Sequence, residues 1–153
     1  MPSRLSYREG DCFALPLRAG GFARGVVVRL DRKGIVLGYF FGPRLASLSE
    51  ATIDDTLRPE KAVLLARFGD LGLQKGEWRV IGHIDPWDRE AWRIPGFLHL
   101  DERGDRGFVR YYDDSLRFVR EERVTGSAIS LHAPRDALLG YGAAEIRLTK
   151  LLA

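Results

Sequence analysis

Short apolar runs separated by glycines and charged residues make up most of this chain. Residues 12–17 predict a first strand, and residues 22–30 and 34–41 are rich in Val, Ile and aromatic side chains, which favours two more. The stretch Asp31-Arg32-Lys33-Gly34 is short and polar and ends in Gly, which is typical of a hairpin turn. We therefore expect a β-rich fold built on tight turns.

The middle of the chain carries further strand signals. Residues 78–84 alternate in polarity and predict a strand, whereas the apolar run 61–68 fits a strand or a helix equally. Residues 108–112 and 116–123 predict two strands, and Asp113-Asp114-Ser115 between them is hairpin-like. This pattern extends the β-rich region to about residue 123.

The last twenty residues differ, because good helix formers follow Gly142. The apolar side chains expected partly on one face of this helix are Ile146, Leu148, Leu151 and Leu152. Residues 134–137 predict the start of a shorter helix, which Gly140 would end. The predicted fold is mainly β (α+β): one small β-barrel-like or strongly bent antiparallel sheet with a C-terminal helix.

Composition and charge narrow the class of protein. The 153 residues fit a single domain over 1–153, and 24 Lys and Arg against 21 Asp and Glu leave a net charge of only +3. One cysteine excludes an internal disulfide and a multi-cysteine zinc site. The first residues lack the apolar segment of a secretory signal, and the nearly apolar stretch 34–42 is far shorter than the roughly 18 residues of a membrane span. We expect a cytoplasmic protein.

Candidate catalytic groups do not converge in the sequence. His83 lies in an apolar run and is interpreted as a hydrogen-bonded structural residue, and Cys12 as a small buried hydrophobe. The carboxylate pairs fit solvated turns; they are Asp54 with Asp55, Asp85 with Asp88, and Asp113 with Asp114. We therefore expect no catalytic residue, no metal site and no cofactor. A hydrolase using His83 with Asp85 or Asp88 is the weakest interpretation.

Residues 85–97 hold more aromatic and charged side chains than a connection needs. Two tryptophans on a proline-braced loop among charges are typical of a protein-binding hot spot. The predicted partner-binding residues are Asp85, Trp87, Asp88, Arg89, Trp92 and Arg93. The alternative is that one or both tryptophans cover the end of a hydrophobic core.

Three segments in order resemble the immunity protein 26 family of bacterial polymorphic-toxin systems. They are YREGDCFALPLRAGGFARGVVV (7–28), FGDLGLQKGEWRVIGHI (68–84) and WRIPGF (92–97). The resemblance covers a core of about residues 7–123, and the C-terminal helical extension of about 134–153 lies outside it. DPWDRE, between the second and third segments, departs from the pattern.

The resemblance implies a non-enzymatic antitoxin that binds one cognate toxin domain and blocks it by occlusion. It implies a protein partner and no membrane, and a monomer is the default oligomeric state. The alternative is a small β-barrel that binds nucleic acid through aromatic residues such as those in 108–112. Scattered arginines interleaved with acids do not favour a nucleic-acid partner, since no basic stripe emerges.

Overall fold

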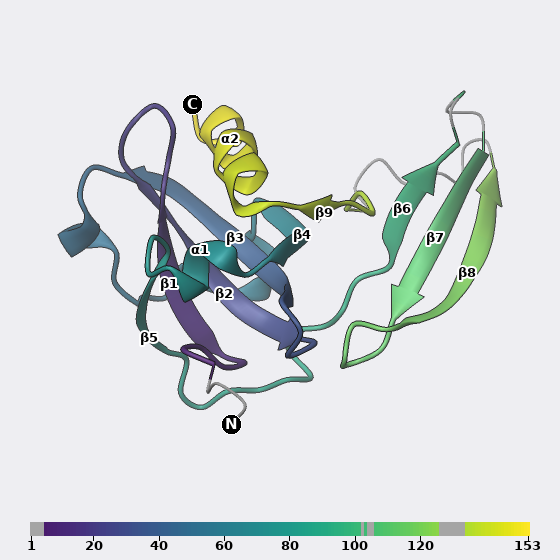
Figure 1. The fold of residues 1–153 in the computed structure, drawn as a ribbon, viewed down its shortest axis with the longest axis horizontal. Coiled ribbons are helices and arrows are strands. Elements are labelled where there is room, and N and C mark those ends of the chain that lie inside the picture. Colours follow the sequence, from purple (N-terminus) through teal and green to yellow (C-terminus); the bar gives the residue numbers. More distant parts are fainter. Residues whose placement is uncertain (1–4, 102, 104–105, 126–133) are drawn as a thin grey trace.

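The computed structural model describes residues 5–101, 103, 106–125 and 134–153, and its strands form two separate sheets (Figure 1). The larger sheet has the order β5-β1-β2-β3-β4-β9. Its strands are β1 (Asp11–Pro16), β2 (Phe22–Leu30), β3 (Ile35–Leu45), β4 (Leu64–Gly69), β5 (Arg79–His83) and β9 (Leu138–Leu139). The smaller sheet, on the right in Figure 1, consists of β6 (Phe97–Leu100), β7 (Arg106–Tyr112) and β8 (Phe118–Thr125).

Tight turns connect the strands β1 to β3, as the sequence predicts. Gly20 and Gly21 adopt positive φ angles of 93° and 81° in the β1–β2 turn, a conformation that glycine adopts without steric cost. In the β2–β3 turn, Asp31 Oδ1 accepts hydrogen bonds from the backbone N–H groups of Lys33 and Ile35 at 2.7 and 2.9 Å. These turns set the antiparallel register of β2 against its neighbours.

Both faces of the larger sheet are covered, so β2 is buried along nearly its whole length. One face packs Phe13, Phe40, Phe68 and Trp78 under the short helix α1 (Leu71–Gln74) and the C-terminal helix α2 (Tyr141–Leu151). Gly25 is required there, because an added Cβ would lie 2.3 Å from the Phe13 ring. The other face is covered by residues 84–97 and by the start of the smaller sheet.

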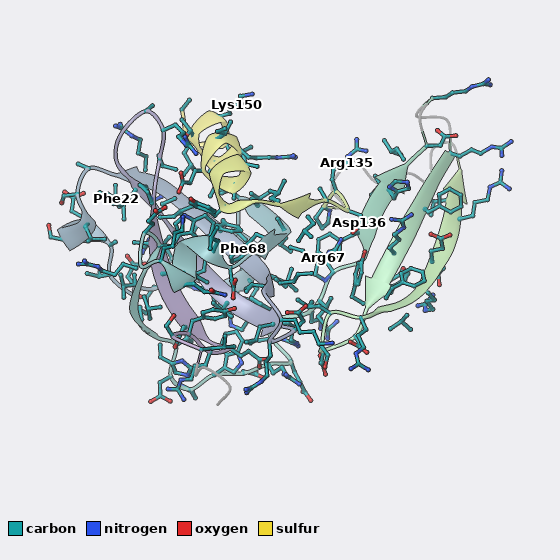
Figure 2. The ribbon with its side chains drawn as sticks, viewed as in Figure 1. Phe22, Arg67, Phe68, Arg135, Asp136 and Lys150 are labelled. Carbon is teal, nitrogen blue, oxygen red and sulfur yellow. The ribbon has the colours of Figure 1, made fainter. Side chains whose placement is uncertain are left out.

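Residues 134–139 join the two sheets. The Leu98 N–H donates to the Pro134 carbonyl, and the Asp136 N–H donates to the Leu98 carbonyl, both at 2.8 Å. The Asp136 carboxylate then accepts from Arg67 of β4 at 2.9 Å and from Arg110 of β7 at 3.0 Å. Figure 2 shows Arg67 and Asp136 between the two sheets.

The structure corrects the predicted fold in two respects. The sheet is not closed into a barrel: in the described residues the larger sheet ends at β5 and β9, and the smaller sheet is separate. The shorter helix predicted from residues 134–137 is also wrong, because these residues are extended and Leu138 pairs in parallel with Arg67 of β4. The mainly β class and the C-terminal helix are confirmed.

Local differences from the prediction are smaller. The ambiguous run 61–68 forms most of strand β4, while α1 and β6 were not predicted. Within α2, Leu148 is buried, whereas Ile146 and Leu151 are about half exposed. The prediction of one partly shared apolar face therefore holds for Leu148 and Leu152, which both pack against the core. No helix in the described part of the chain is long and apolar enough to cross a membrane.

Candidate partner-binding surface

A buried arginine fastens the 84–96 loop to the larger sheet. Arg29 of β2 donates from Nη1 to the carbonyls of Val28 at 2.7 Å and Trp92 at 3.0 Å, and from Nη2 to the carbonyl of Arg89 at 3.2 Å. Its Nε donates to Asp114 Oδ1 at 2.9 Å, in the β7–β8 turn. One side chain thus holds the loop and this turn against the body of the protein.

Trp92 lies in the hydrophobic core, with 4% of its surface exposed. Its ring packs edge-on against Tyr39 and Phe41, with centroid distances of 5.3 and 6.0 Å. The Tyr39 hydroxyl also donates to the Arg93 carbonyl at 2.5 Å. A residue packed in this way fixes the shape of the loop, and its predicted contact with a partner stays a prediction.

Trp87 is half-buried and stacks on Trp92 at 5.5 Å. Its Nε1 donates to Glu9 Oε2 at 2.8 Å, and Arg89 donates to both Glu9 oxygens at 2.9 and 2.7 Å. Arg89 Nη1 also donates to Asp114 at 3.2 Å. The loop therefore adds two side-chain contacts with the N-terminal segment to the backbone contacts made by Arg29.

These contacts shift the pKa values of both carboxylates. Burial raises the pKa of Glu9, but the hydrogen bonds from Arg89 and Trp87 outweigh this effect and hold it below its usual value. The hydrogen bond from Arg29 is the largest cause of the lowered pKa of Asp114. Both carboxylates are therefore charged near neutral pH, and each forms an ion pair with an arginine: Glu9 with Arg89, and Asp114 with Arg29 and Arg89.

Three of the predicted residues lie on the outside of the loop. Asp85, Asp88 and Arg93 are exposed. Asp88 Oδ1 accepts the backbone N–H of Glu90 at 3.1 Å, whereas the side chains of Asp85 and Arg93 contact no charged group among the described residues. Of the six predicted residues, the structure thus buries one tryptophan, half-buries the other and presents four charges.

Two hollows flank the Arg89–Asp114 pair. The larger, of about 670 Å³, lies between the N-terminal segment, the β2–β3 turn and the β7–β8 turn. The smaller, of about 390 Å³, is lined by Arg29, Arg89, Glu90, Arg93, Ile94 and Asp114. Their mixed-charge walls suit the polar side chains of a protein partner.

Groups considered for catalysis have structural partners. His83 Nδ1 contacts Asp11 Oδ1 at 2.9 Å, so its carboxylate partner is neither Asp85 nor Asp88. Cys12 is fully buried, and burial raises the pKa of its thiol to about 12. No group of three or more His, Cys, Asp or Glu that could hold a metal ion occurs within the described residues, and His132 lies outside them.

Two of the aromatic residues considered for base stacking, Tyr111 and Tyr112, are also engaged. The Arg120 guanidinium lies over the Tyr111 ring at 4.1 Å. Tyr112 packs against Phe97 and donates to Asp136 at 2.8 Å. These contacts give no support to a nucleic-acid surface on β7, because stacking needs an accessible ring face.

Sequence reasoning missed Arg29, Glu9 and Asp114. A charged residue inside the run Val26 to Leu30 is the one signal that could have been noticed, since a buried arginine needs several acceptors. The acceptors that Arg29 contacts in the loop and in the β7–β8 turn lie 60 to 85 residues from it along the chain, so a local sequence pattern cannot identify them.

A family model described as Immunity protein 26 matches residues 8–106, which is more than half of the chain. The matched region contains strands β1 to β6 and the whole 84–96 loop. Comparison with curated proteins and with solved structures gives no match.

Proposed function

The chain belongs to the immunity protein 26 family, and on this premise we propose that it binds a cognate bacterial toxin domain and neutralises it. Inhibition is by occlusion: the bound protein covers the active site of the toxin or the path of its substrate. The family match over residues 8–106 carries this proposal. The inhibitor catalyses no step and needs no cofactor, because covering a surface requires only affinity.

The geometry of the 84–96 loop supports a role in binding. Arg29, Tyr39 and Glu9 hold the loop by hydrogen bonds, so little conformational entropy is lost when a partner binds. Asp85, Asp88 and Arg93 are presented outward from this fixed loop. The proposed interface consists of these charges with Arg89, supported by the two tryptophans beneath them.

Charge complementarity would set the choice of toxin. The loop carries both signs, and complementary charges accelerate association and penalise wrong partners without a large net charge. Because Arg89 is already paired with Glu9, the exposed Asp88 and Arg93 are the side chains best placed to discriminate. This interface predicts a toxin surface with complementary mixed charge.

The test is binding and rescue with the toxin domain whose gene adjoins the gene of this chain. Co-expression should restore growth, and the purified proteins should form a stable complex. Mixed-sequence oligonucleotides at low salt serve as a second probe, for which no binding is expected. Absence of both rescue and complex would contradict the proposed function, and salt-sensitive oligonucleotide binding would favour the nucleic-acid alternative.

Variants separate contact from support within the loop. Asp88→Lys with Arg93→Glu should weaken toxin binding with only a small fall in melting temperature, because both side chains are exposed and only the hydrogen bond from the Glu90 N–H to Asp88 is lost. Trp92→Ala should instead lower stability by about 3–5 kcal/mol, since it empties a packed core position. Trp87→Ala shows whether the half-buried ring contributes to binding, to stability or to both.

A further inference from the structure

Helix α2 exposes two large apolar side chains that its own fold does not bury. Ala144 and Leu148 are fully buried, and they pack with Leu152 against the core under the larger sheet. Outside this buried face, Ile146 and Leu151 are 47% and 50% exposed. They are five residues apart, about 140° around the helix, and the cations Arg147 and Lys150 lie between them.

Every outward side-chain charge of the described C-terminal segment, residues 134–153, is positive. Its two acids point inward: Asp136 is paired with Arg67 and Arg110, and Glu145 accepts the Trp78 Nε1–H at 2.8 Å and pairs with Arg18 at 3.2 Å. The cations left outside are Arg135, Arg147 and Lys150. None of these three has an ion-pair partner in the part of the chain that the structure describes.

The cations and the apolar side chains form one surface. A groove of about 410 Å³ is lined by Ala143, Ile146, Arg147, Lys150 and Leu151. We call these five residues the α2 stripe. Arg147 also lines a small cavity together with Arg135, so the positive charge continues toward β9. Figure 2 shows Arg135 and Lys150 on the same side of the molecule.

We infer that the α2 stripe is a second docking surface for the toxin, and that it takes an acidic amphipathic helix of that protein. This inference rests on the proposed function. Carboxylates of such a helix would neutralise Arg147 and Lys150 in the middle of the groove, and its apolar side chains would contact Ile146 and Leu151 on either side. A basic partner would add like charges to cations that have no counter-charge of their own, which excludes it.

The position of the stripe distinguishes it from the loop. It lies outside residues 8–106, so it is not part of what the family match covers. In Figure 1, α2 is at the top of the molecule and the segment after β5 runs along the bottom. The stripe is therefore a separate contact, and it supplies selectivity particular to this chain.

Two double variants test the inference by calorimetry against the neighbouring-gene toxin domain. Ile146→Ser with Leu151→Ser removes the apolar contact, and Arg147→Glu with Lys150→Glu reverses the charge. Each should weaken binding at least about tenfold. The loss from charge reversal should shrink at high salt, because screening weakens exposed charge pairs.

Arg79→Glu with Arg123→Glu is the matched control. It makes the same change in net charge at exposed arginines that have no ion pair among the described residues. It should change the Kd less than about twofold. Carbodiimide, which joins amines directly to carboxylates, should link Lys150 to a toxin helix and should not link the exposed Lys61. Circular dichroism and melting confirm that each variant is folded.

The outcomes separate the two proposals. If the unaltered protein does not bind the toxin, the proposed function and this inference fail together. If it binds and both stripe variants bind as the control does, the inference alone is overturned. Binding of the unaltered protein to phosphatidylglycerol vesicles, with no effect of the stripe variants on toxin affinity, would assign the stripe to a membrane surface and also overturn it.

Discussion

Replacement of Arg29 by methionine tests how the loop is held. Methionine keeps most of the aliphatic stem but removes every donor of the guanidinium. Two of the lost hydrogen bonds are buried, those to the carbonyls of Val28 and Trp92. The other two, to the Arg89 carbonyl and to Asp114, lie nearer solvent, so water can replace them.

The magnitude follows from the two buried bonds. A hydrogen bond from a charged donor contributes about 1.5–3 kcal/mol, and a buried acceptor left without a donor loses that amount. We therefore expect Arg29→Met to lower the free energy of unfolding by about 3–5 kcal/mol. In a chain of this size that corresponds to a fall in melting temperature of roughly 10 °C.

The assay is urea denaturation followed by circular dichroism and by tryptophan fluorescence. Fluorescence reports on Trp92, whose carbonyl is one of the lost acceptors. Arg93→Met is the control, because Arg93 is exposed in the same loop, and it should change stability by less than about 0.5 kcal/mol. A loss below about 1 kcal/mol for Arg29→Met would refute the conclusion that this residue fastens the loop.

Three further predictions concern other parts of the fold. Asp136→Ala should lower the free energy of unfolding by about 3 kcal/mol, measured by denaturation, because it leaves Arg67 and Arg110 without their shared carboxylate; an unchanged midpoint would contradict this. The folded pKa of Glu9 lies below its usual 4.5, so its contribution to stability is present above that pH and is lost as pH falls through the folded pKa. In Glu9→Gln, the free energy of unfolding should therefore fall less steeply as the pH is lowered below about 4.5, and an unchanged pH dependence would contradict this prediction. Cys12 should resist a thiol reagent in the native protein at about pH 8 and react after unfolding; rapid native labelling would show that it is accessible.

Local patterns were sufficient for the central strands. The turn at residues 31–34 carries its own signals, an aspartate that caps backbone N–H groups and a glycine at positive φ. Strands β1 to β3 follow directly from the apolar runs on either side of such turns. These elements could be predicted because their determinants lie within a few residues of each other.

Elements set by distant contacts could not be predicted. Residues 134–137 have a helical start signal, but pairing with Leu98 and the contacts of Asp136 with both sheets hold them extended. The barrel prediction failed for the same reason, since separation into two sheets depends on where the long connections return. The tryptophans of the loop were visible in the sequence, whereas their support by Arg29 and Glu9 depends on contacts across more than 60 residues.

The most direct test of the account is the affinity of the full chain for the toxin domain encoded beside it. Titration calorimetry at physiological salt should give a one-to-one complex with a Kd in the nanomolar range or below, and saturating protein should abolish toxin activity. A complex without loss of toxin activity would contradict inhibition by occlusion. Absence of any complex at micromolar concentrations would contradict the proposed immunity function itself.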